Sequence, residues 1–128
     1  MKRTLTHLAF CAFTLGTFGG LAKAHAAEDL PERIVKMIER MAADTDANKP
    51  DCDKIAAALN KHADDDAKLI KEAKAADEKK TPEQKAAEKK DMEAKYGARM
   101  KAAFLKMAPL KECKTNEKIK AYRTKVGM

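Results

Sequence analysis

The feature that most constrains this sequence is a pair of long stretches that lack helix breakers and are joined by a short turn. The first, residues 50–78, has no glycine and no proline after its opening residue, and the second, residues 82–108, has one glycine after its own opening proline. Between them Thr81 and Gln84 have the spacing of a capping box, in which two side chains satisfy backbone N–H groups at a helix start. The sequence therefore predicts two helices of about 40 Å at 1.5 Å per residue. Because their connection is short, we expect a long antiparallel helical hairpin.

Two short helices are predicted to flank the hairpin. Pro31 opens the first of them, and Gly127 ends the last, which covers residues 115–126. Their apolar residues recur at spacings of three and four, as on one face of a helix: Ile34, Met37, Ile38 and Met41 in the first, and Ile119, Tyr122 and Val126 in the last. Aromatic residues make up only 5% of the chain, which argues against a β-sandwich or barrel core. The predicted fold is therefore all-α, four-helix and bundle-like.

The large apolar residues of the hairpin are expected to form a core at its open end, where the flanking helices meet it. These residues are Ile55, Leu59, Met100, Phe104 and Met107. The far half of the hairpin, residues 64–95, is mainly alanine and charged residues. We expect this half to project as a thin, solvated tip. A more even four-helix bundle is the alternative.

The first 26 residues differ in kind from the rest. They contain three basic residues and no acidic one, an apolar stretch over residues 5–22, and small residues at positions −3 and −1 of a cut after Ala26. This is the layout of a secretory signal peptide, and the stretch is short for a retained membrane span. We therefore predict cleavage after Ala26, export by a Sec-type route, and a periplasmic or extracellular domain over residues 27–128 with no membrane span.

Cleavage would leave two of the three cysteines, Cys52 and Cys113. An even pair of cysteines in an exported chain of this size predicts a disulfide. Cys52 begins one arm of the hairpin and Cys113 lies just past the end of the other arm. Because both fall at the open end, the bond agrees with the predicted topology.

The sequence lacks the residues that most catalytic sites need. It has no serine, and after processing its one histidine is His62, ten residues from Cys52 on the same predicted helix. The two side chains would be about 15 Å apart along the helix axis, which is too far for them to act together. Phosphate-binding glycine loops, H-E-x-x-H and C-x-x-C patterns are also absent. We predict that the protein is not an enzyme and carries no cofactor.

One small group of residues has the chemistry of a metal ligand set. His62 and Asp66 are four residues apart and Asp65 is adjacent, so they could hold one edge of a divalent metal site. The same residues can equally form a solvated charge cluster, with Lys61 and Asp65 paired at spacing four. We favour the charge cluster and keep metal binding or buffering as an alternative.

The basic residues suggest where a partner could bind. Cleavage would lower the net charge from +7 to +4, and the remaining lysines are interleaved with acids, which argues against nucleic acid. The candidate contact residues are Lys79 and Lys80 at the turn, and Lys114, Lys118 and Arg123 in the basic C-terminal run that includes the last helix. We predict a small exported helical protein that acts by non-covalent interaction, with an unknown protein or an anionic envelope component as its partner. A chaperone-like holdase is a further alternative.

Overall fold

The computed structural model describes residues 28–128, and the predicted signal peptide lies outside the described residues. The described chain forms, in order, α2 (Leu30–Asn48), α3 (Cys52–Asn60), α4 (Ala63–Glu78), α5 (Pro82–Lys106), the 3-10 helix η1 (Ala108–Lys111) and α6 (Glu117–Val126). None of these helices combines the length and apolarity that a transmembrane span requires. The all-α fold and the disulfide between Cys52 and Cys113 are confirmed.

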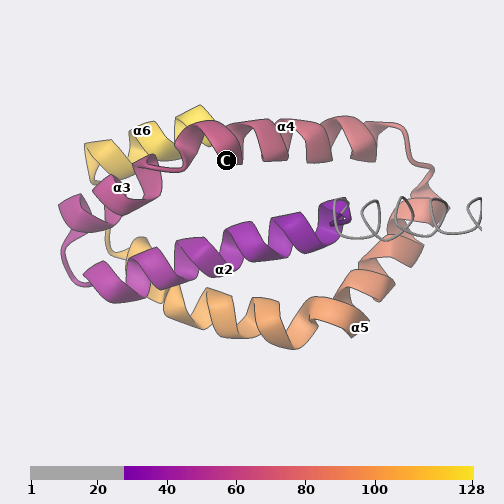
Figure 1. Ribbon diagram of the computed structural model, residues 1–128, viewed down its shortest axis with the longest axis horizontal. Helices are drawn as coiled ribbons and strands as arrows, with labels where there is room; N and C mark the ends of the chain where they lie inside the picture. The colour runs from indigo at the N-terminus through magenta and orange to yellow at the C-terminus, as the bar shows by residue number, and fades with distance from the viewer. Residues whose placement is uncertain (1–27) are drawn as a thin grey trace, which may run out of the picture.

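The helices are arranged as a bundle in which α2 lies between the two arms of the hairpin. Figure 1 shows α4 and α5 running to a shared turn, with α2 between them and α6 alongside α3 and the start of α4. α2 packs mainly against α5 and α3, whereas α4 and α5 make few direct contacts with each other. The predicted hairpin is therefore present, but its arms are joined through the first helix more than through each other.

The first long helix is broken, which the sequence analysis did not predict. The chain turns at Lys61 and His62, so residues 52–78 form α3 and α4 instead of one helix. Three consecutive aspartates follow in the first turn of α4, where the helix dipole favours negative charge. These aspartates are a helix-start signal inside a stretch that has no glycine or proline to mark a boundary.

The predicted helix boundaries hold closely elsewhere. Thr81 and Gln84 form the complete capping box at the start of α5, with Gln84 N–H donating to Thr81 Oγ1 at 3.2 Å and Thr81 N–H donating to Gln84 Oε1 at 2.9 Å. Pro50 lies before the N-cap Asp51, so it does not open α3 as expected. Gly127 ends α6 with a φ of 77°, a left-handed conformation that suits glycine.

The core lies at the disulfide end, as predicted, but with a different composition. Its buried members come from α2, α3, the start of α4, the segment after η1, and α6: Met37, Met41, Ile55, Ala56, Leu59, Ala63, Cys113, Ile119, Tyr122 and Val126. The expectation for Ile55 and Leu59 is confirmed, whereas Met100 and Met107 are only half-buried. Phe104 was expected in this core and is 54% exposed, so that prediction is wrong.

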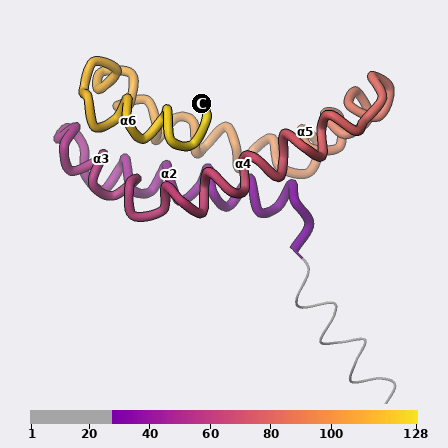
Figure 2. The backbone as a smooth tube through the Cα atoms, turned by 90° about the horizontal axis from the view of Figure 1, so that it is seen from above, coloured from indigo at the N-terminus to yellow at the C-terminus, as the bar shows by residue number. Residues whose placement is uncertain are grey.

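The outer part of the hairpin tip is solvated, but the prediction for residues 64–95 holds only in part, because Asp66 is buried and Leu69 and Ile70 pack against the core. No residue between Asp66 and Tyr96 is buried. Figure 2 shows the ends of α4 and α5 extending past the start of α2 to one end of the molecule. The tip lacks a core because alanine and charged side chains offer little apolar surface to bury.

Candidate binding surface

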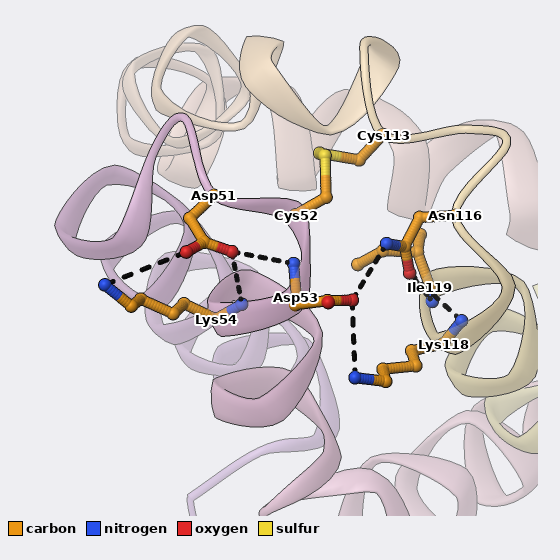
Figure 3. The surroundings of a disulfide bond; sticks show 8 residues. All are labelled: Asp51, Cys52, Asp53, Lys54, Cys113, Asn116, Lys118 and Ile119. Atoms are coloured by element: carbon orange, nitrogen blue, oxygen red, sulfur yellow. Dashed lines mark hydrogen bonds and ion pairs between the residues drawn. A yellow bond between two sulfur atoms is a disulfide. The ribbon is translucent and has the colours of Figure 1, made fainter.

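The disulfide end holds α3 and α6 side by side (Figure 3). Cys52 opens α3 and is bonded to Cys113, with 5.5 Å between the two Cα atoms. Beside the bond, Asp53 accepts a hydrogen bond from Asn116 Nδ2 at 3.1 Å and lies 3.4 Å from Lys118 Nζ. The hydrogen bond from Asn116 and then the ammonium of Lys118 lower the pKa of the Asp53 carboxyl. The start of α6 is therefore held on α3 by one covalent and two polar links.

The cations predicted as contact residues in α6 and in the turn before it are not equivalent. Lys118 is engaged with Asp53, and two neighbouring lysines of the same helix are also in ion pairs, Lys120 with Glu117 and Lys125 with Asp64. Arg123 and Lys114 are exposed, and no carboxylate within residues 28–128 pairs with either of them. Of the predicted C-terminal contact residues, these two have charge to offer a ligand.

The predicted contact residues at the turn are Lys79 and Lys80. Lys79 is the exposed C-cap residue of α4, and Lys80 is in an ion pair with Glu88 of α5. Close by, Lys85 pairs with Asp77 at 2.9 Å. The charges of the tip thus join its two helices to each other. Beside Lys80 lies a hollow of about 360 Å³ whose apolar lining includes Leu30, Ile34 and Met92 and whose charged lining mixes lysines with the acids Asp77 and Glu88.

The most exposed large apolar residues of a helix lie on α5. Only Tyr96 and Ala103 of this helix are buried, seven residues apart and so on one face. That face packs against α2, whereas Phe104 and Leu105 are 54% and 70% exposed. Phe104 and Leu105 are consecutive and so point about 100° apart around the helix axis, which is the one signal in the sequence for apolar surface outside the packed face of α5.

The exposed apolar residues line an open groove of about 1050 Å³ along α5 and η1, which we call the α5 groove. Its apolar lining is formed by Met92, Met100, Phe104, Leu105, Met107 and Leu110. Its charged lining is formed by Lys89, Lys101 and Lys111 against a single acid, Glu93. The groove therefore presents an apolar strip with a mainly cationic border.

A second hollow lies at the other side of η1 and is called here the α6 pocket. It measures about 530 Å³ and combines residues of α2, α3, η1 and α6. Lys114 and Arg123, which the sequence analysis singled out, both line it. The structure thus brings two of the five predicted contact residues to one concave site.

An ion cluster joins α5 to α2. Arg99 donates from Nε and Nη2 to the two carboxylate oxygens of Glu39, both at 2.7 Å, and from Nη1 to Glu32 at 3.0 Å. These hydrogen bonds lower the pKa of both glutamates. Because Glu32 and Glu39 belong to α2, the cluster joins the two helices.

A buried carboxylate connects three helices at the centre of the molecule. Asp66 of α4 is 2% exposed, accepts a hydrogen bond from Tyr122 Oη of α6 at 2.9 Å, and is in an ion pair with Arg40 of α2. Burial and then the hydrogen bond to Asp66 raise the pKa of the Tyr122 hydroxyl. Both carboxylate oxygens are engaged, so this group stabilises packing and is not presented to a ligand.

The candidate metal ligands have different surroundings in the structure. His62 stands just before α4, Asp65 is exposed, and Asp66 faces Arg40 and Tyr122. Across residues 28–128, no three side chains of histidine, cysteine, aspartate or glutamate gather as a metal site would require.

The surface of this chain has to be interpreted from its own chemistry. Comparison with protein-family models, with characterised proteins and with solved structures finds no match. The two features with the character of a binding site are the α5 groove and the α6 pocket, since each combines concave apolar surface with a cationic edge.

Proposed function

We propose that this chain is a small exported helical protein that acts by non-covalent binding, without catalysis, and that the α5 groove is its contact surface. The observation that carries the proposal is the exposure of Phe104 and Leu105 beside three groove-lining methionines. A contiguous apolar surface with a polar border is typical of a protein interaction site. Apolar residues that are exposed singly are common on folded proteins and would not indicate a binding site.

Two features support the exported location. The first 26 residues have the three-part pattern of a signal peptide, and the remaining two cysteines form a disulfide. Disulfides persist in oxidising compartments and are rare in the cytosol. The protein is therefore placed by this proposal in the periplasm or outside the cell.

The border of the groove indicates the charge of the partner. Lys89, Lys101 and Lys111 outnumber Glu93 along the lining. A complementary partner would present an apolar helix or segment with acidic residues on its flanks, because complementary charge steers association and suppresses wrong partners. We propose a protein partner of this kind.

Site-specific photo-crosslinking tests the surface. A photo-reactive residue is placed at Leu105 in one variant and at Lys71, an exposed residue of α4, in a matched variant. In cells that produce the full chain, the Leu105 variant is expected to give a discrete adduct that the Lys71 variant lacks. Equal adducts from both positions, or none from Leu105, would contradict the proposal.

The exported location has its own measurement. The intact mass of the protein recovered from the exported fraction should correspond to a chain starting at Ala27. It should be two hydrogens lighter than the reduced chain, because Cys52 and Cys113 are bonded. A retained Met1 in the recovered protein would overturn the predicted processing.

A chaperone-like holdase is a second candidate, favoured by the methionines of the groove. Met92, Met100 and Met107 are flexible and polarizable, and such side chains adapt to apolar partners of varied shape. A holdase would suppress the aggregation of a denatured client at equimolar ratio, measured by light scattering. Phe104→Ser should reduce the suppression, and an unchanged aggregation curve with the natural chain would remove this candidate.

A further inference from the structure

We propose that the α6 pocket is a binding site for a single-chain fatty carboxylate. The inference goes beyond the proposed function. The two hollows share Met107, Leu110 and Lys111, but the floor of the α6 pocket and its cations Lys114 and Arg123 are not part of the α5 groove.

The floor of the pocket is apolar and belongs to the core. Met41, Leu59 and Ile119 line it, and each is no more than 3% exposed. The ring of Tyr122 also lines the floor, while its hydroxyl is bonded to Asp66. An acyl chain in this pocket would move from water to an apolar lining, which favours binding.

The wall of the pocket leaves room for one chain. Half-buried Leu110 and Met107 form one side, and Met128 is 52% exposed at the edge. The volume of about 530 Å³ falls within the size of pockets that hold one small molecule. A two-chain lipid would have to leave much of its apolar surface outside.

The edge of the pocket selects the charge of the ligand. Three cations, Lys111, Lys114 and Arg123, line it, and no acidic side chain does. Their charges are available, because none of the three is in an ion pair with a carboxylate in residues 28–128, in contrast to Lys118, which pairs with Asp53 at 3.4 Å. A guanidinium also matches the planar geometry of a carboxylate with two parallel hydrogen bonds.

The apolar floor and the cationic edge together match an amphiphilic ligand with a negative head group. An apolar chain without a charge would leave the cations unused, and an inorganic anion would make no contact with the apolar lining. A monocarboxylate with one long chain uses both features, with the head group at Arg123 and Lys114 and the chain directed towards Leu59 and Ile119.

A fluorescence titration tests this site with defined probes. The full chain is expressed and purified, and a dansyl-labelled undecanoic acid is added below its micellar concentration. We expect a saturable increase in emission at a ratio of one probe to one chain. Palmitate should displace the probe, whereas hexadecylamine, with the same chain and the opposite charge, should not.

Matched variants separate the pocket from the net charge. The double substitution Lys114→Gln with Arg123→Gln should weaken binding of the probe about tenfold. This is the combined loss of affinity expected when two partly solvated ion contacts are removed. Lys118→Gln with Lys120→Gln removes the same charge from positions outside the pocket and should leave affinity within about twofold. Circular dichroism spectra and melting curves check that all variants are folded.

Several outcomes would overturn the proposal. Equal displacement by hexadecylamine would show binding by the chain alone, and equal weakening by both double variants would show a non-specific charge effect. Binding to anionic phospholipid vesicles without binding of monomeric palmitate would point to a membrane surface. Self-association that excludes the probe would make a second copy the occupant. Because photo-crosslinking at Leu105 reports on a different surface, its result stands whatever the titration gives.

Discussion

The buried Asp66 gives the sharpest test of how this bundle is held together. Asp66 is 2% exposed and is shared by Tyr122 of α6 and Arg40 of α2, so one carboxylate connects three helices. Asp66→Asn keeps the size of the side chain and still offers one oxygen to the Tyr122 hydroxyl. What it removes is the charge that Arg40 faces.

The magnitude follows from these contacts. Loss of a hydrogen bond to a charged group costs about 1.5–3 kcal/mol. The Arg40 side chain is 35% exposed and can turn towards water, so we place the Asp66→Asn cost near the middle, at about 2 kcal/mol. Asp66→Ala also leaves the buried Tyr122 hydroxyl without an acceptor and should cost about 3 kcal/mol. Tyr122→Phe leaves the ion pair in place and should cost about 1.5 kcal/mol.

Urea denaturation followed by circular dichroism measures these free energies of unfolding. Asp65→Asn is the matched control, because Asp65 lies in the same first turn of α4 but is exposed. It therefore removes the same helix-dipole contribution, about 0.3–1 kcal/mol, without touching the buried cluster. If Asp66→Asn cost no more than Asp65→Asn, the carboxylate would not stabilise the packing of the three helices and the reasoning would be wrong.

Two further predictions concern the links at the edges of the bundle. Cys52 and Cys113 are 61 residues apart, so reduction of their bond should lower the free energy of unfolding by about 4 kcal/mol. Urea denaturation curves of the oxidised and the reduced chain measure this difference. A loss under about 1 kcal/mol would contradict the loop-closure argument. Arg99→Met should lower the melting temperature at pH 7, and the difference should shrink below about pH 4.3. Arg99 holds the pKa of Glu32 and Glu39 below the ordinary value for a glutamate. The stability that these ion pairs contribute is therefore fully present above the ordinary pKa and is lost as the pH falls through the lowered, folded-state pKa. A difference that stayed constant down to pH 3 would refute it.

The helices that follow local rules were predictable from the sequence. The capping box at Thr81 and Gln84, the glycine at position 127 and the spacing of apolar residues in α6 all act within a few residues of chain, and each is found as expected. The break at His62 was missed because a boundary without glycine or proline leaves only the run of aspartates as a signal. Among the contact residues, Lys114 and Arg123 were named from charge alone, and their common pocket was not foreseen.

The candidate surfaces depend on long-range packing that no local pattern encodes. Periodicity places Met100, Phe104 and Met107 along one side of α5, and from this we expected a core position for Phe104. In the structure α2 lies between the arms and covers the Tyr96 side of α5, which leaves Phe104 exposed. A helix has more than one apolar direction, and the choice among them depends on which helix packs against it.

An all-helical chain with a disulfide at one end and a charged, largely solvated tip at the other was predictable without knowledge of the packing. These properties follow from composition, capping and the positions of two cysteines. The tertiary structure alone decided which apolar side chains stay at the surface and which cations remain unpaired beside them. The physical reason is that exposure and pairing are relations between segments distant in the chain, such as Arg99 with Glu39 and Asp66 with Arg40, and a helical pattern is compatible with several such pairings.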